Sequence, residues 1–220
     1  MGGKTVIVHQ VLNNNLISTL DENREEVLLW GKGIGWKSKR GQAVDESKIE
    51  KIFRMDTSDS MNRLKQLLGE VDDETIEASS EIIEYARGKL DKKLNRNVYI
   101  TLTDHISFAV ERQKKGINFH NVLRWEIRKF YAAEYAIGKH ALDIIKEKMH
   151  MELPEDEAGA IALHIVNSVI IAVPFVNQMG QWLWILVELP GWRIHTSQEQ
   201  HLNHGNGQLI RKDCDMFVNY

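Results

Sequence analysis

Short apolar runs separated by turn residues occupy the first quarter of the chain. Residues 6–53 carry runs rich in Val, Ile, Leu and Trp, with Asn, Asp and Gly between them. The runs are Val6–Leu12, Leu16–Leu20, Glu26–Trp30 and Ile34–Lys37. Such runs are typical of strands, so the pattern predicts a small antiparallel sheet of about four strands. A sheet of that size cannot cover both of its own faces, and we therefore expect it to dimerise.

From about residue 57 the pattern changes to a helical period. Apolar residues recur three and four positions apart, with charged residues between them. The helical segments are Met61–Leu68, Glu74–Leu94, Thr103–Lys115, Leu123–Tyr131, Gly138–Met149 and Pro154–Val169. These segments predict a helical bundle. The expected fold class is therefore α+β and multidomain, with a four-stranded antiparallel sheet followed by an all-α bundle.

The last fifty residues follow neither pattern. They hold three of the six tryptophans, and Pro174, Pro190 and several glycines interrupt any helical period. The run from Val169 to Val187 is apolar, but Pro, Asn, Gln and Gly inside it argue against a membrane span. We assign no regular fold here. The expected division is residues 1–58, residues 59–169 and a tail of residues 170–220.

The composition of the chain indicates the cellular compartment in which we expect the protein. The chain has 220 residues, 43% of them apolar, and a formal net charge of −3. Its single cysteine, Cys214, excludes an intramolecular disulfide and fits a reducing compartment. The N-terminus lacks the apolar core of a signal peptide, so we expect a cytoplasmic protein.

The segment Trp30–Gly41 combines features that suit nucleic acid. It contains four cations, two tryptophans, four glycines and no acidic residue, so phosphate attraction, base stacking and close backbone approach are available together. The cations are Lys32, Lys37, Lys39 and Arg40. Asn13, Asn14 and Asn15 add amide groups that can read base edges. The alternative interpretation is a Gly-rich hairpin with a solvated basic tip and two core tryptophans.

Two of the nine histidines stand out in the helical region. His105 follows Thr103 and Asp104, either of which would cap a helix and place His105 in its first turn. His164 falls two to three turns into the helix opened by Pro154, among small and apolar residues. A histidine on such a face is usually a core or interface residue. No metal-ligand spacing, catalytic triad or phosphate-binding loop is present, so the chain predicts no enzyme, metal site or cofactor.

Several segments together match a known family. The segments are 11–15, 31–36, 48–53, 102–105, 119–125, 135–139 and 153–167. On these residues the chain resembles the BglG/SacY family of bacterial transcriptional antiterminators, most closely members that control β-glucoside utilisation. The similarity runs from about Val6 to Ser168. It implies an N-terminal co-antiterminator domain, a dimer of four-stranded sheets that binds an RNA hairpin in the leader of a sugar operon and prevents termination.

The resemblance also implies which residues face the RNA. The set is Asn15, Gly31, Lys32, Gly33 and Trp36, with Asn13, Asn14, Lys37, Lys39 and Arg40 close by. Three positions depart from the family pattern: Gln10 and Lys32 stand where lysine and arginine are common, and Trp36 stands where phenylalanine is usual. The loss of a cation at Gln10 would weaken binding, whereas Trp36 keeps a stacking surface.

The helical region resembles a PTS regulation domain, in which His105 and His164 match histidines that accept phosphate from the sugar phosphotransferase system. Expected partners are therefore an RNA hairpin, a second copy of the chain, the sugar-specific enzyme II and HPr, with no DNA.

Family members carry a second regulation domain, and the similarity ends before it. We therefore expect a truncated or frame-shifted product, which need not be active, or a genuine alternative ending. Two rival functions remain: a phosphotransferase-system phosphocarrier, and a DNA-binding activator with a helix-turn-helix before residue 57.

Overall fold

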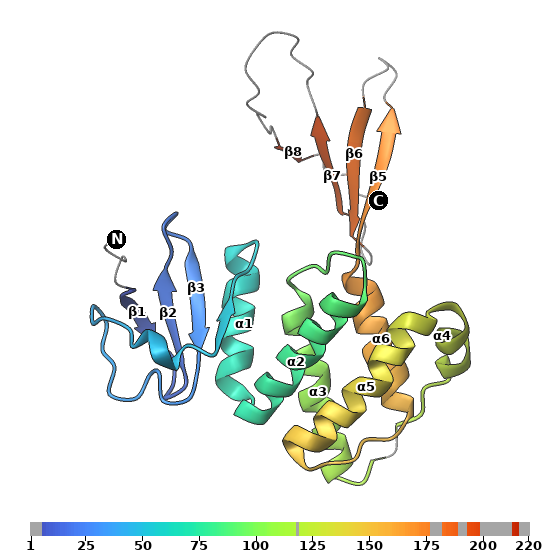
Figure 1. Cartoon of the computed structure of the whole chain (residues 1–220), viewed down its shortest axis with the longest axis horizontal. Coiled ribbons are helices and arrows are strands. Elements are labelled where there is room, and N and C mark those ends of the chain that lie inside the picture. Colours follow the sequence, from blue (N-terminus) through green and yellow to red (C-terminus); the bar gives the residue numbers. More distant parts are fainter. Residues whose placement is uncertain (1–5, 118, 177–181, 189–192, 199–212, 216–220) are drawn as a thin grey trace.

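A four-stranded sheet, a bundle of helices and a second sheet follow one another along the chain (Figure 1). The structure is a computed structural model that describes residues 6–117, 119–176, 182–188, 193–198 and 213–215. The order of a small antiparallel sheet and then six α-helices confirms the predicted fold class.

The first sheet is antiparallel, with its strands in sequence order. The strands are β1 (Val8–Val11), β2 (Leu16–Leu20), β3 (Glu26–Trp30) and β4 (Lys51–Phe53). The predicted strand at Ile34–Lys37 was wrong, because the chain turns there and has positive φ angles of 71° at Gly33 and 59° at Lys37. The fourth strand lies later, after a short 3-10 helix, η1 (Glu46–Lys48).

Most of both faces of this sheet is covered within one chain, although Ile52 of β4, which pairs with Leu29, is 54% exposed. Leu16, Leu28, Trp30 and Phe53 belong to the main apolar cluster of the molecule, which also contains residues of the helices. On the other face, Val8, Ile17, Val27 and Leu29 pack with Ile34 and Val44 from the segment that joins β3 to η1. A second copy of the chain is therefore not needed to cover a whole face of the sheet. The dimer stays a prediction.

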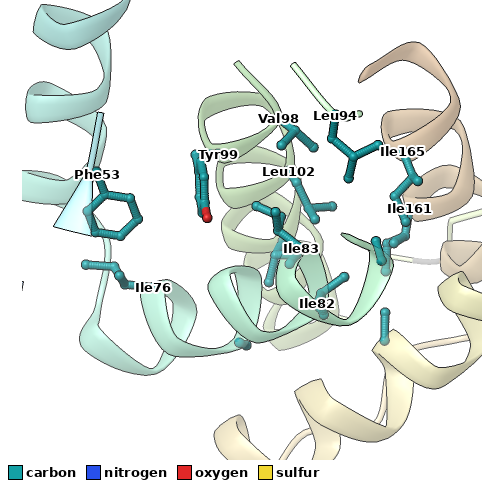
Figure 2. Close-up of a cluster of buried hydrophobic side chains, with 14 of the residues drawn as sticks. Phe53, Ile76, Ile82, Ile83, Leu94, Val98, Tyr99, Leu102, Ile161 and Ile165 are labelled. Atoms are coloured by element: carbon teal, nitrogen blue, oxygen red, sulfur yellow. The ribbon is translucent and has the colours of Figure 1, made fainter. Parts of the chain in front are cut away.

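Six helices form the bundle at about the predicted places. They are α1 (Ser58–Glu70), α2 (Asp73–Lys89), α3 (Val98–Lys114), α4 (Arg124–Phe130), α5 (Ala132–Met149) and α6 (Asp156–Ser168). Thr57 caps α1 by accepting a hydrogen bond from the Ser60 N–H at 3.1 Å. Ile82, Ile83, Leu102, Ile161 and Ile165 meet in the buried core of the bundle (Figure 2).

The apolar core continues from the bundle into the sheet. Phe53 of β4 stands beside Ile76 of α2 and Tyr99 of α3 (Figure 2). The Phe53 and Tyr99 rings meet edge to face with their centroids 5.2 Å apart. This shared core fixes the sheet on the helices and brings the start of α2 to the end of the sheet where β1 turns into β2 (Figure 1).

The tail contains strands, although its sequence suggested no regular fold. The strands β5 (Ile170–Val176), β6 (Trp182–Glu188), β7 (Arg193–Gln198) and β8 (Asp213–Asp215) form an antiparallel sheet in sequence order. Its prolines and glycines break a helical period but allow strands, and Pro174 lies on the edge strand β5, where a missing N–H is tolerated. Trp192 and Pro190 lie outside the described residues. Among the described helices, none has the length and apolar character of a membrane span.

Candidate nucleic-acid interface and histidine pair

The turn between β1 and β2 lies against the segment that follows β3. The Gly31 N–H donates to the Asn15 carbonyl at 3.0 Å, and the Gly35 N–H donates to the Asn14 carbonyl at 2.9 Å. The turn itself is tightened by the Asn15 N–H, which donates to Asn13 Oδ1 at 2.8 Å. The two segments that contain the predicted RNA-binding residues are separated in the sequence, but they form one surface at one end of the sheet.

The side chain of Asn15 connects the β1–β2 turn with the segment after β3 and with helix α2. Its Oδ1 accepts a hydrogen bond from the Gly33 N–H at 2.7 Å. Its Nδ2 donates to Asp73 Oδ2 at 2.5 Å, and Asp73 is the first residue of α2. The same carboxylate accepts from Trp30 Nε1 through its other oxygen, at 3.2 Å. The side-chain amide of Asn15 is therefore already engaged with protein groups in the free chain.

Two glycines permit the close approach of these segments. A Cβ at Gly31 would lie 1.8 Å from the Lys48 carbonyl oxygen, and a Cβ at Gly35 would lie 2.1 Å from the Asn13 carbonyl oxygen. Both glycines are buried. Gly31 therefore shapes the proposed surface from within, and Gly35, which the sequence analysis did not include in the site, has the same part.

The two tryptophans of the segment have different environments. Trp30 is buried in the core, with 2% of its surface exposed, whereas Trp36 is 58% exposed. Trp30 is therefore a core residue, as the alternative interpretation expected for both tryptophans. Only Trp36 remains a candidate for stacking on a base. An exposed indole beside a cationic loop is a surface on which a base can stack.

The cationic side chains of the segment point to solvent. Lys32, Lys37, Lys39 and Arg40 are exposed, as are Asn13 and Asn14. Within the part of the chain that the structure describes, no carboxylate forms an ion pair with any of these four cations. Lys39 and Arg40 line a shallow hollow together with His9, Gln10 and Ser38. Their charges are free to meet phosphate groups.

The second candidate site is a pair of histidines inside the bundle. His105 lies on α3 and His164 on α6, and their ring centroids are 4.7 Å apart at an interplanar angle of 42°. The expectation that His105 lies in the first turn of a helix was wrong, because α3 begins at Val98 and His105 stands near its middle. A helix N-terminus therefore does not contribute to the chemistry of His105. His164 does fall about two turns into α6, as expected.

A buried carboxylate and an arginine complete the cluster around these rings. Glu157 Oε2 lies 3.1 Å from His105 Nε2, and Glu157 Oε1 lies 2.6 Å from Arg112 Nη2. Burial alone would raise the pKa of the Glu157 carboxyl, but its neighbours His105 and Arg112 outweigh burial and hold that pKa below its usual value. Neither residue was predicted, because nothing in the local sequence distinguishes Arg112 or Glu157 from the other charged residues of the helices.

His164 is held in its neutral form. Burial lowers the pKa of His164 to about 4, and the nearby His105 adds to this effect while Glu157 opposes it. A neutral imidazole keeps a free electron pair near neutral pH and is a competent nucleophile. The contact of this ring with the His105 ring, with the Arg112 cation nearby, forms a site that fits phosphoryl transfer. The described residues hold no group of three side chains that would bind a metal ion.

Comparisons with known proteins match both parts of the chain. The family model of the CAT RNA binding domain matches residues 6–62, and that of the PRD domain matches residues 80–168. The transcription antiterminator LicT of Bacillus subtilis (strain 168) is 47% identical over 161 residues, which cover 73% of this chain and 58% of that protein. The β-glucoside operon antiterminator of Dickeya chrysanthemi is 42% identical over 161 residues, 73% of this chain and 57% of that protein.

A solved structure has the same arrangement of sheet and helices. The crystal structure of GlcT CAT-PRDI is 35% identical, with a TM-score of 0.66, and the match covers 75% of this chain and 98% of that one. The chain spans less than three fifths of the length of the curated relatives named above. The matched part contains both candidate sites.

Proposed function

Because the chain belongs to the BglG/SacY family of transcriptional antiterminators, we propose that it binds an RNA hairpin in the leader of a sugar-utilisation operon and prevents termination there. The observation that carries this proposal is the surface built by the β1–β2 turn and the segment after β3, with unpaired cations and the exposed Trp36. The relative from Dickeya chrysanthemi, which is named as a β-glucoside operon antiterminator, supports a β-glucoside operon as the target.

The proposed contacts divide by chemistry. Lys32, Lys37, Lys39 and Arg40 would neutralise phosphates, and Trp36 would stack on an unpaired base. Asn13, Asn14 and Asn15 would donate to base edges or sugars. Gly33 would allow the backbone to come close to the RNA, and the buried Gly31 would act by keeping the loops in place. Residues 6–53 contain four strands, their connecting loops and one three-residue 3-10 helix, so the helix-turn-helix that a DNA-binding activator requires is not found in that range.

Removal of the stacking ring should weaken RNA binding strongly. We expect Trp36→Ala to cost about 1–3 kcal/mol of binding free energy, because stacking on one base contributes that much. Lys32→Ala should reduce the slope of log K against log salt by about one, because one phosphate contact is lost. Gel-shift titrations against leader hairpins from the organism's own genome, at several salt concentrations, measure both effects. Wild-type affinity and slope in both variants would remove this surface from the proposal.

We further propose that His105 and His164 accept phosphate from the phosphotransferase system and that this modification controls RNA binding. The contact between the two tilted rings and the neutral state of His164 support this. Each phosphate adds about −1.5 to −2 charges in a confined space, which would force the cluster to rearrange. A homodimer and a cytoplasmic location, which the family also implies, belong to the same proposal.

Phosphoryl label should therefore appear on His105 and His164 after incubation with purified enzyme II and HPr. Peptide mapping under conditions that preserve phosphoramidates identifies the labelled residues. The exposed His120 and His150 serve as internal controls, because they lie outside the cluster. Label confined to these controls would contradict the assignment.

A further inference from the structure

Asp73 belongs to the helical domain but touches the proposed RNA surface. Its carboxylate lies at the first residue of α2, where the positive end of the helix favours a negative charge. One oxygen accepts from Asn15 Nδ2 at 2.5 Å, and the other accepts from Trp30 Nε1 at 3.2 Å. The two donors come from the sheet, 58 and 43 residues earlier in the chain.

These two contacts have different consequences. The Trp30 contact satisfies an indole N–H whose ring is buried, so it stabilises the join between sheet and helices. The Asn15 contact involves a part-buried residue of the RNA surface, and it occupies an amide N–H that faces α2. Because Asn15 Oδ1 accepts from the Gly33 N–H at 2.7 Å, the amide cannot turn away without also breaking its hydrogen bond to the segment after β3.

The Asp73 carboxylate opposes the binding of RNA at Asn15. It takes a donor that a base or sugar could use, and its charge repels phosphate groups that approach Asn15. RNA can use this donor of Asn15 only when the hydrogen bond to Asp73 is broken. The apolar contact of Phe53 with Tyr99, which also joins sheet and helices, places no charge near the RNA surface.

We propose that Asp73 competes with RNA for the side-chain amide of Asn15, and that the helical domain restrains the RNA surface through this contact. The proposal rests on the proposed function, since it takes the loops around Asn15 as the RNA surface. A displacement of α2 that withdraws the Asp73 carboxylate frees Asn15 and removes a negative charge from the surface at the same time.

Asp73→Asn tests the proposal with little risk to the fold. The amide oxygen of the new residue still accepts from the buried Trp30 Nε1, whereas its NH₂ group cannot accept from Asn15. We expect the full chain with Asp73→Asn to bind the leader hairpin about tenfold more tightly than wild type, which corresponds to about 1.4 kcal/mol. The probe is the RNA hairpin from the organism's own sugar operon, titrated at fixed salt.

Two controls separate this contact from a general charge effect. Asp72→Asn removes the same charge at the exposed neighbouring residue and should leave the dissociation constant within about twofold of wild type, since a single exposed charge has a small effect. In an Asn15→Ala background, Asp73→Asn should give much less tightening, because the competed group is gone and only the loss of the charge remains.

The outcomes are distinct. Unchanged or weaker binding by folded Asp73→Asn, or equal tightening with and without Asn15, overturns the competition while the proposed function stands. Absence of binding by the wild-type chain in the same titration overturns the proposed function and this inference together. Circular dichroism of each variant establishes that it is folded.

Discussion

Gly31→Ala should abolish most RNA binding without touching a surface residue. Its Cβ would lie 1.8 Å from the Lys48 carbonyl oxygen, and the backbone at Lys48 cannot yield without moving the start of β4. Overpacking against a rigid neighbour costs on the order of 3 kcal/mol. Because only the fraction of molecules with correctly placed loops binds, the apparent affinity should fall roughly a hundredfold.

Gly41→Ala is the matched control for this prediction. Gly41 has a φ of 86°, but nothing lies within 4 Å of an added Cβ. The alanine should therefore cost only about 1–2 kcal/mol of backbone strain, without displacing β4. Gel shifts of both variants, with circular dichroism of the helices as a check on folding, measure the difference. Equal RNA affinities for the two variants would contradict this account of the loops.

Arg112→Met should cause the largest loss of stability in the helical bundle. Arg112 Nη2 lies 2.6 Å from Glu157 Oε1, and Glu157 is only 1% exposed. Removal of one partner leaves a buried carboxylate with reduced compensation, which typically costs about 3–5 kcal/mol. Urea unfolding of the full chain, followed by the helical circular-dichroism signal, measures the loss of free energy.

The double variant Arg112→Met/Glu157→Gln is the control, because it removes both charges and should recover most of the stability. The pH dependence gives a second check. In the wild-type chain the lowered pKa of Glu157 contributes stability that is present above the unfolded value and is lost as pH falls through the folded value. Without Arg112 that pKa rises, so the deficit of the single variant should shrink as pH falls. A deficit independent of pH and of Glu157 would show that Arg112 stabilises by packing alone.

Local patterns in the sequence predicted the strands and helices better than they predicted the contacts between them. The run Glu26–Trp30 coincides with β3, because a short continuous apolar run fits a strand that is covered on both faces. The run Ile34–Lys37 resembled a strand, but glycines with close neighbours and positive φ angles make it a loop. The true fourth strand, Lys51–Phe53, has three residues and is too short to carry a pattern.

The site could be predicted only in part, for the same reason. The cations and Trp36 were visible as a local cluster of residue types. The contact of Asp73 with Asn15 joins residues that are 58 positions apart, and the contact of Arg112 with Glu157 joins residues 45 apart. No spacing in the sequence indicates such pairs. His105 was placed at a helix start because Thr103 and Asp104 resemble caps, whereas both lie inside α3, where tertiary packing overrides that preference.

Single-round transcription in vitro tests the central claim most directly. The template carries the leader and terminator of the organism's own sugar operon, and read-through is measured with and without the full chain. The account predicts that the wild-type chain raises read-through, that Trp36→Ala lowers this effect strongly and that Asp73→Asn increases it. Termination that stays unchanged at saturating, folded wild-type protein, on every leader that contains a matching hairpin, would contradict the account.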